Sequence, residues 1–342
     1  MVMNQWCNVM RWEKATRPFL RTSEFLWQEG HTVQASKKEA EEDAQKMLDI
    51  YIKMSKDLLA IPMLSGQKSE REKFAGAVAT YGIEAVLRDG KCLQSGTTHD
   101  LGTNFAKAAD IKFLNKNGEW EYGYSTSWGI STRLIGAVIM VHGDERGIKL
   151  PPKIAPTQVV LVPVAMHKQG VLEKVNEVAE RLKNAGIRVF VDDTDASPGW
   201  KFNQWEMKGV PLRIEIGPRD IENNNAVLVR RDTHEKIFVL QYDIEQTVVE
   251  LLDDIQINMY NISKEYVDKS TRSVNTVQEL VDCVAEKHVG IASHCGDIDC
   301  EQALKDETGI RSRVILPGKC NDEKCIRCGK KAKYRAYFAK QY

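Results

Sequence analysis

The chain has 342 residues with 48 basic and 48 acidic side chains, so its formal net charge is zero. This length allows two or three domains, and the charge balance means that any contact with nucleic acid must come from a local basic patch. No apolar run is long enough to span a bilayer, and no signal-peptide pattern occurs at the front. Five of the eight cysteines lie between Cys295 and Cys328, which indicates a metal site in a reducing compartment and predicts a cytoplasmic protein.

The first segment mixes strand and helix patterns. Residues 8–13 (NVMRWE) and 19–27 (FLRTSEFLW) alternate as strands do and predict an antiparallel hairpin around Lys14–Pro18. Such a hairpin would place Arg11 and Arg21 on neighbouring strands.

A helix is predicted over residues 36–59, where Ser36 and Glu39 form a capping box. Its expected apolar stripe consists of Met47, Ile50, Tyr51, Met54 and Leu58. Residues 91–102 (KCLQSGTTHDLG) are expected to be a strand end that runs into a polar turn. Residues 124–144 predict a strand and then a buried helix with Arg133 near its start.

Residues 149–156 (KLPPKIAP) form the clearest linker, because their three prolines cannot continue a helix or a central strand. An alternating pattern follows, with strands predicted at 158–164, 187–193, 210–217, 226–231 and 236–241 and an amphipathic helix at 170–186. This order predicts a small mixed sheet covered by helices. A long helical pattern over residues 244–274 leads into the cysteine-rich segment.

The cysteines give the strongest spacing signal. Cys295 and Cys300 have four residues between them, and Cys325 and Cys328 form a CxxC knuckle. Thiolates at these spacings can close a tetrahedron around zinc, which leaves no open position and makes the metal structural. The alternative is a set of reduced cysteines that never meet. Cys320 is a fifth candidate, but it forms no knuckle.

Arginines and aromatic residues are interleaved over residues 11–32 (RWEKATRPFLRTSEFLWQEGHT). Arginine forks suit two-point contact with phosphate or carboxylate, although a salt-bridged hairpin is the alternative for this pattern. Neither a Walker loop nor a G-x-G-x-x-G motif occurs, so any nucleotide must be held by side chains.

Two further stretches suggest recognition. Residues 94–105 gather Gln94, Thr97, Thr98, His99 and Asn104 in what we expect to be one turn, which suits a polar small molecule. A solvated histidine is the alternative there. Residues 198–220 mix basic and aromatic side chains, as single-stranded RNA recognition does, and a core with a solvated rim is the alternative.

Taken together, these motifs closely resemble the prolyl-tRNA synthetases of the archaeal and eukaryote type, a class II aminoacyl-tRNA synthetase family. Residues 4–32 are similar to motif 2 of the family, 127–152 to motif 3 and 198–220 to its anticodon-binding domain. The terminal CGDIDC, CIRCG and AKQY are similar to its zinc-bearing C-terminal domain. The resemblance covers essentially the whole chain.

The resemblance implies an α/β (α+β) fold in three parts. These are an antiparallel-sheet catalytic domain over residues 1–155, an α/β anticodon-binding domain over 156–256 and a small zinc-containing α+β domain over 257–342. Family members carry motif 1 ahead of motif 2, and this sequence lacks it. We therefore expect an incomplete catalytic domain with little activity alone, and the homodimer of the family stays open here.

The resemblance also implies a two-step reaction. Proline and ATP, with Mg²⁺ on its phosphates, give prolyl-adenylate and pyrophosphate, and the prolyl group then moves to tRNA(Pro). The expected function is therefore proline–tRNA ligase, and the alternative is a non-catalytic tRNA-binding remnant or a fragment that needs a partner chain.

The family pattern assigns roles to individual residues. Those expected to be catalytic are Arg11, Arg21 and Arg133. Those expected to bind ATP are Arg11, Glu13, Arg21, Thr22, Gln94, Thr97, Ser131 and Arg133. Those expected to bind proline are Arg11, Phe25, Trp27, His31, His99 and Trp128. Those expected to bind tRNA are Lys201, Arg213 and Arg219, and those expected to bind zinc are Cys295, Cys300, Cys325 and Cys328.

Overall fold

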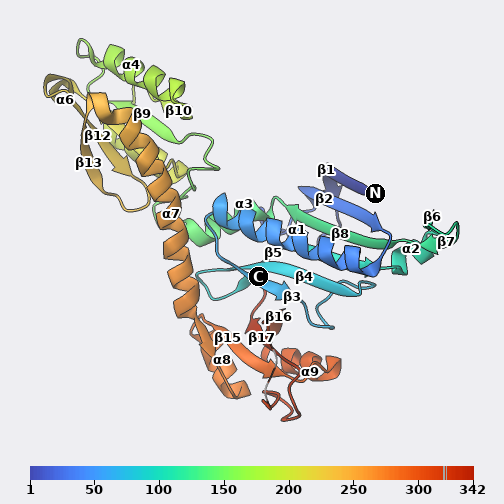
Figure 1. Ribbon diagram of the computed structural model, residues 1–342. Coiled ribbons are helices and arrows are strands. Elements are labelled where there is room, and N and C mark those ends of the chain that lie inside the picture. The colour runs from blue at the N-terminus through green and yellow to red at the C-terminus, as the bar shows by residue number, and fades with distance from the viewer. Residues whose placement is uncertain (319, 321) are drawn as a thin grey trace. The chain divides into compact units, whose positions relative to one another are not determined.

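The computed structural model describes residues 1–318, 320 and 322–342 (Figure 1). The chain forms two compact units. The first unit contains Met1–Lys56, Pro62–Val141 and Glu265–Tyr342, and the second contains Asp57–Ile61 and His142–Lys264. Both combine helices with sheets, which confirms the predicted fold class. Within the described ranges, no helix is both long and apolar enough to cross a membrane.

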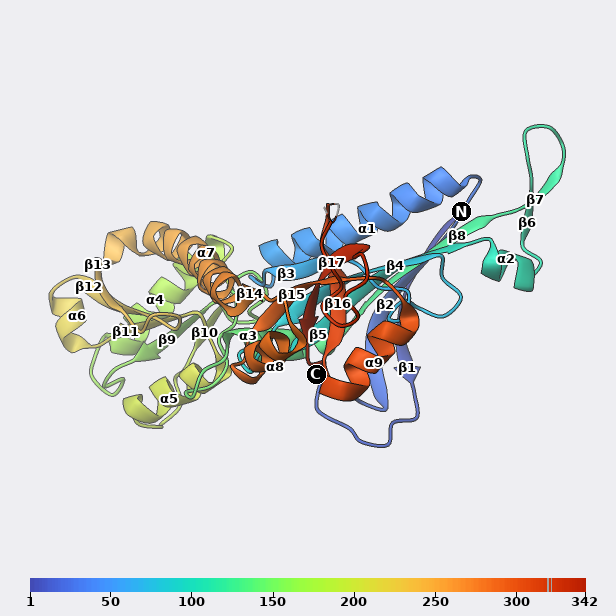
Figure 2. The same cartoon turned by 90° about the horizontal axis from the view of Figure 1, so that it is seen from below.

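A six-stranded antiparallel sheet is the centre of the first unit, with the strand order β1-β2-β8-β5-β4-β3. Its strands are β1 (Val2–Met10), β2 (Glu24–Gln34), β3 (Met63–Gln67), β4 (Ala79–Val86), β5 (Cys92–Gly102) and β8 (Tyr124–Ser131). Helix α3 (Arg133–His142) follows β8, as the sequence predicts. Figures 1 and 2 show α2 (Asn104–Ala108), β6 (Lys112–Leu114) and β7 (Trp120–Tyr122) projecting beyond the end of β8.

Helix α1 (Lys37–Asp57) packs on this sheet, where Leu48 and Tyr51 share a core cluster with Ile83 and Trp128. The predicted capping box is confirmed, because Ser36 N donates to Glu39 Oε2 over 3.0 Å and Glu39 N donates to Ser36 Oγ over 3.3 Å. The predicted apolar stripe is wrong in part. Ile50 and Leu58 are exposed, and the buried face consists of Ala40, Ala44, Leu48, Tyr51 and Ser55.

The predicted N-terminal hairpin exists, but its strands lie further from the turn than expected. Arg11 and Arg21 therefore lie in the connecting loop, residues 11–23, and not on the strands. Pro18 has no N–H to give to a ladder, and Phe19 has a φ of 59°, which no strand accommodates. The bond from Arg11 N to Ser23 O, 2.7 Å, closes the loop.

The predicted polar turn over residues 91–102 is also wrong, because this stretch is strand β5. It pairs with β4 on one side and with β8 on the other, so its backbone groups are satisfied in the ladder. Threonine favours strands, and the polar side chains of β5 do not require solvent when they face a cavity.

The C-terminal part of the first unit is a four-stranded sheet with the order β14-β15-β17-β16. Its strands are β14 (Thr271–Ser273), β15 (Val289–His294), β16 (Arg311–Ile315) and β17 (Tyr334–Ala339), and its helices are α8 (Val277–Ala285) and α9 (Ile298–Thr308). It shares a core cluster with the larger sheet, formed by Leu64, Val86, Cys92, Val289, Val314 and Ala339. Tyr342 N donates to Cys92 O over 3.1 Å, so the chain end pairs with the start of β5.

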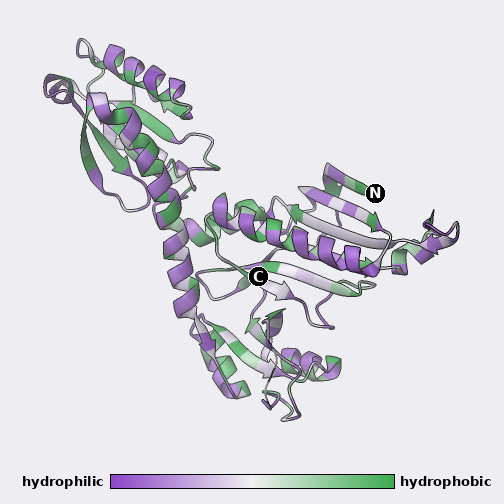
Figure 3. Ribbon diagram, in the orientation of Figure 1, coloured by the Kyte–Doolittle hydropathy of each residue, from purple (hydrophilic) through white to green (hydrophobic). Residues whose placement is uncertain are grey.

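The second unit is the predicted mixed sheet with helices. Its strands lie in the order β10-β9-β11-β12-β13 and are β9 (Val159–Pro163), β10 (Val189–Val191), β11 (Leu212–Ile216), β12 (Asn225–Arg230) and β13 (Lys236–Leu240). Its helices are α4 (Val171–Asn184), α5 (Pro198–Lys208), α6 (Pro218–Glu222) and α7 (Ile244–Ser270), the last belonging to this unit up to Lys264. Figure 3 shows apolar central strands and mixed helices, as expected of a sheet buried under amphipathic helices.

Candidate active site and candidate metal centre

A cavity of about 500 Å³ lies in the first unit. Its walls come from strands β2, β4, β5 and β8, the 11–23 loop, the segment after β3 and the start of α3. Nine residues singled out from the sequence line it, namely Arg11, Phe25, Trp27, Gln94, Thr97, His99, Trp128, Ser131 and Arg133. Residues up to 122 positions apart, Arg11 and Arg133, therefore meet in one place.

Strand pairing explains why they meet. Side chains at every second position of a strand point to the same face, and Phe25, Trp27 and Glu29 obey this rule on β2. Trp27 pairs with Ser131 of β8, and His99 of β5 pairs with Ser127 of β8.

A smaller pocket of about 50 Å³ adjoins the cavity, because Arg11, Phe25, Ser131 and Arg133 line both. The 11–23 loop forms much of its wall. The loop supplies Glu13, Arg21 and Thr22 there, together with Phe19 and Leu20. All eight residues expected to bind ATP thus line one or other of the two connected pockets, and three of them are arginines.

Arg133 is anchored by backbone groups. Its Nε donates to Leu20 O over 3.0 Å, and its Nη1 donates to Gln94 O over 3.3 Å. Burial, and after it the charge of Arg21, lowers the pKa of Arg133. An arginine stays protonated after such a shift, so its charge is available to an anion.

We call the smaller pocket the arginine end of the site and the part of the cavity lined by aromatic rings its aromatic end; Arg11 and Phe25 lie where the two meet, because they line both. Phe25 and Trp27 meet edge to face at 5.9 Å between ring centroids, and the guanidinium of Arg11 lies 5.4 Å and 5.1 Å from their ring centres. Trp128 is 6% exposed and lies directly against Gly30 of β2, where an added Cβ would come within 2.2 Å of the indole. Only glycine therefore lets the indole lie flat on this strand.

His99 is an uncharged polar group at this end. Burial lowers its pKa to about 4, although Glu29 opposes the shift. Its Nδ1 lies 2.9 Å from Thr80 Oγ1, and its ring centre lies 5.0 Å from that of Phe74. A neutral imidazole can donate or accept a hydrogen bond to a ligand without adding a charge to the site.

His31 is the one predicted proline-site residue that does not line the cavity. It follows Glu29 by two positions on the same strand, and its Nε2 lies 3.4 Å from Glu29 Oε2. Glu29 itself is a wall residue to which the sequence analysis gave no role, although strand alternation from Trp27 could have found it.

Other lining residues were also missed, among them Lys68, Glu72, Phe74, Thr80 and Ser127. Ser127 lies within a predicted strand, so its face could have been derived from Ser131. The others belong to a stretch without a motif, and only the tertiary structure brings them to the cavity.

The three residues expected to bind tRNA have different surroundings. Lys201 is 1% exposed, and its Nζ donates to Asp192 O over 2.8 Å and lies 3.7 Å from Asp192 Oδ1. Arg213 is 7% exposed and pairs with Glu215 at 2.9 Å. Both charges are thus compensated inside the second unit, whereas Arg219 is exposed. Their contact with tRNA stays a prediction.

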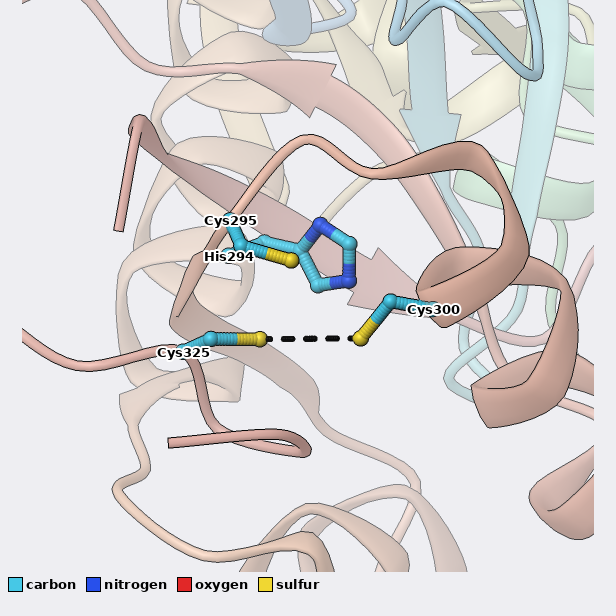
Figure 4. Close-up of side chains that lie close together, drawn as sticks. All are labelled: His294, Cys295, Cys300 and Cys325. Atoms are coloured by element: carbon cyan, nitrogen blue, oxygen red, sulfur yellow. Dashed lines mark hydrogen bonds between the residues drawn. The ribbon is translucent and has the colours of Figure 1, made fainter. Parts of the chain in front are cut away.

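The cysteines of the C-terminal part meet. Ligand atoms of His294, Cys295, Cys300 and Cys325 all lie within 4.8 Å of one another (Figure 4). The Sγ atoms of Cys300 and Cys325 are 3.9 Å apart, close to the ~3.8 Å between two thiolates on one tetrahedral zinc with Zn–S bonds of ~2.3 Å. This donor set therefore fits zinc.

The fourth ligand has two candidates. The predicted one, Cys328, is exposed, and its Sγ lies 3.6 Å from Cys295 Sγ. The other is His294, which the sequence analysis missed although it directly precedes Cys295. Its Nδ1 accepts a bond from Gly296 N, while its buried Nε2 has no partner among the described residues. The Sγ atom of Cys320 lies 3.9 Å from Glu323 Oε2.

Comparison with known protein families is consistent across the chain. The tRNA synthetase class II core domain (G, H, P, S and T) matches residues 1–142. An anticodon binding domain matches residues 158–253, and the C-terminal domain of prolyl-tRNA synthetase matches 277–342. The antiparallel sheet with its arginine-lined cavity is therefore the core of a class II aminoacyl-tRNA synthetase.

Sequence similarity to known proteins shows which class II family the chain belongs to. The chain is 52% identical to the proline–tRNA ligase of Clostridium novyi (strain NT), over 99% of this chain and 71% of that protein. It is 55% identical to the proline–tRNA ligase of Alkaliphilus oremlandii (strain OhILAs) and 50% identical to proline–tRNA ligase 2 of Bacillus thuringiensis (strain Al Hakam), with the same coverage of each. The chain belongs to the prolyl-tRNA synthetase family.

Proposed function

We propose that this cavity activates L-proline with ATP and that the resulting prolyl-adenylate donates its prolyl group to the terminal ribose of tRNA(Pro). One observation carries the proposal. In a class II core, a small pocket lined by three arginines adjoins a cavity whose wall carries aromatic rings and a neutral histidine. The arginine end suits a triphosphate, and the aromatic end suits a compact apolar ring.

Adenylation is a displacement at the α-phosphorus, in which a carboxylate oxygen of proline forms the new bond and pyrophosphate leaves. A protein accelerates such a step mainly by position and by positive charge. We assign Arg11 to the proline carboxylate and the α-phosphate, because it lines both pockets. Arg21 and Arg133 are assigned to the other phosphates, and Mg²⁺ enters with ATP as its phosphate-bound counterion.

The remaining polar residues of the two pockets would hold the nucleotide. These are Glu13, Thr22, Gln94, Thr97 and Ser131. Phe25, Trp27, His99 and Trp128 are proposed to wall the proline site, where ring shape selects the substrate. His31 is proposed to act from behind Glu29 and not by touching proline, because it lies outside the cavity wall.

The other parts of the chain are proposed to bind tRNA and to stabilise the fold. Arg219 is the exposed cation of the three tRNA candidates. We propose that Cys295, Cys300 and Cys325 hold a structural zinc with Cys328 or His294 as the fourth ligand. The proposed domain boundaries remain residues 1–155, 156–256 and 257–342, and the proposed location is the cytoplasm.

Aminoacylation of a tRNA(Pro) transcript with labelled proline tests the proposal. Transfer of proline but not of alanine to the transcript supports it. Binding of the transcript with no transfer of proline would instead make the chain a tRNA-binding protein. The Arg133→Ala variant is the matched control, since it should lose transfer and keep transcript binding.

A further inference from the structure

The segment from Lys68 to Phe74 lines the cavity and is held in place by the C-terminal part of the first unit. Lys68, Glu72 and Phe74 all contribute to the cavity wall. None of them lies on a strand of the six-stranded sheet, although Lys68 N donates to Thr80 O of β4 over 2.7 Å. Beyond Lys68, the position of the segment depends on backbone turn bonds within it and on side-chain bonds.

The first set of bonds is a buried ion cluster. Glu84 of β4 is completely buried and pairs with Lys68 on one side and with Arg313 of β16 on the other. Arg313 Nη2 donates to the two carboxylate oxygens of Glu84 over 2.9 Å and 2.8 Å. Removal of either cation would leave the buried carboxylate of Glu84 with an incomplete set of partners and disturb the other ion pair. Arg313 lies 229 positions along the chain from Glu84, so the C-terminal part supplies one third of this cluster.

A second set of bonds holds the same segment one residue further on. Ser69 Oγ donates to Glu301 Oε1 of α9 over 2.8 Å, and Ser312 Oγ donates to Ser69 Oγ over 3.1 Å. Arg71 Nε donates to Gln302 Oε1 over 2.8 Å. Two neighbouring residues of α9 and one of β16 thus fix the start of the segment.

The far end of the segment reaches the aromatic end of the cavity. Phe74 N donates to Thr80 Oγ1 over 3.0 Å, and this hydroxyl lies 2.9 Å from His99 Nδ1. The rings of Phe74 and His99 are 5.0 Å apart. Phe74 belongs to the wall of the proposed proline site, and the segment that carries it is bonded to the C-terminal part through Lys68, Ser69 and Arg71. The two regions are therefore connected by this segment.

The arginine end has a different support. Arg11, Arg21 and Arg133 come from the 11–23 loop and from α3, and Arg133 is anchored to Leu20 and Gln94. Among the described residues, no hydrogen bond or ion pair joins these arginines to the Lys68–Phe74 segment, so we expect the arginines to keep their positions when the segment shifts. The charge of Glu84 still acts on Arg133, where it opposes the lowering of the pKa.

We propose that Arg313 and Glu301 are positioning residues for the amino-acid end of the cavity, acting through Glu84, Lys68 and Ser69 on the Lys68–Phe74 segment. This inference rests on the proposed function, because it takes the aromatic end to be the proline site. Neither residue lines the cavity. Their effect is on proline affinity, transmitted through the segment.

Calorimetric titration of the full chain tests it, with L-proline and Mg²⁺–ATP as separate ligands and with Arg313→Met and Ser69→Ala as variants. We expect the proline Kd to rise on the order of tenfold in each variant, as follows from loss of positioning contacts. The ATP Kd should stay within about twofold, the scatter expected of independent sites. Arg313→Lys, which keeps the charge but not the fork, should lie between Arg313→Met and the unmodified chain.

Arg272→Ala is the matched control, because Arg272 forms an exposed ion pair with Glu286 in the same C-terminal part, 2.6 Å apart. It should change neither Kd. If Arg313→Met fails to fold by circular dichroism, Ser69→Ala, which keeps the ion cluster, decides the question. Unchanged proline affinity in the folded variants, or an equal loss of ATP affinity, overturns the inference. An unmodified chain that binds ATP but no proline overturns the proposed function first, and the inference with it.

Discussion

The guanidinium of Arg133 donates a hydrogen bond of 3.0 Å to the backbone carbonyl of Leu20. This bond ties the first residue of α3 to the loop that carries Arg11 and Arg21. A second bond from the same side chain, 3.3 Å to Gln94 O, reaches β5. One side chain therefore holds together three elements that wall the arginine end of the cavity.

Arg133→Lys should weaken ATP binding on the order of tenfold to a hundredfold, because lysine cannot make both backbone bonds and a lost charged hydrogen bond costs about 1.5–3 kcal/mol. Calorimetric titration with Mg²⁺–ATP measures the effect. Lys14→Ala is the control, since Lys14 is exposed in the same loop and lines neither pocket. An unchanged ATP affinity in Arg133→Lys would contradict the assignment of Arg133 to the nucleotide.

Gly30→Ala should displace Trp128, because the new Cβ would lie within 2.2 Å of the indole. Such overpacking lowers the free energy of unfolding by about 1–3 kcal/mol. Chemical denaturation measures it, and Trp128 fluorescence should shift. Gly199→Ala is the matched control, as a Cβ there meets nothing within 4 Å. Equal stability of the two variants would show that the indole adapts.

Acid should destabilise the fold through His99. Burial lowers its folded pKa to about 4, with Glu29 opposing, while an unfolded histidine titrates near ~6.5. Between these values only the unfolded chain binds the proton, so the free energy of unfolding falls as pH decreases through this window. From about pH 7 to about pH 5 the loss from this residue is about 2 kcal/mol.

Denaturant titrations at both pH values measure that loss. His99→Gln should show a smaller decrease than the unmodified chain, while the exposed His167→Gln should behave like the unmodified chain. The same pH dependence in His99→Gln would rule out His99 as its source.

Metal content separates the two candidates for the fourth zinc ligand. A closed structural site predicts about one zinc per chain. Cys325→Ser should lose the metal and loosen the C-terminal part, and Cys320→Ser should keep it. Loss of zinc in Cys328→Ser but not in His294→Ala would select the thiolate, and the reverse would select the imidazole. Full zinc in Cys325→Ser would refute the site.

The sequence predicts elements well where the signal is local. Strands β9 and β12 contain short apolar runs, β11 alternates apolar and charged residues, and α4 has a clear amphipathic period, so the local pattern predicts the second unit. The Gly, Ser and Thr residues of residues 91–102 predict a turn, but this stretch forms strand β5. Several of its polar side chains face the cavity. The cavity is formed by residues far apart in the sequence, so a short stretch of sequence does not reveal it.

The site shows the same division. Arg11, Gln94 and Arg133 could be named from motifs, but the hydrogen bonds of Arg133 to the 11–23 loop and to β5 depend on the tertiary fold. The cluster of Lys68, Glu84 and Arg313 joins residues up to 245 positions apart in the printed sequence. No spacing within the sequence encodes such a contact, so it could be found only in the structure.

The central claim is that the cavity activates proline with ATP, and proline-dependent exchange of pyrophosphate into ATP tests it most directly. The account predicts exchange by the chain with L-proline, little exchange with alanine or cysteine, and a strong loss in Arg133→Ala. Exchange that does not depend on proline would contradict the claim. So would a folded chain that shows no exchange and binds neither ATP nor proline.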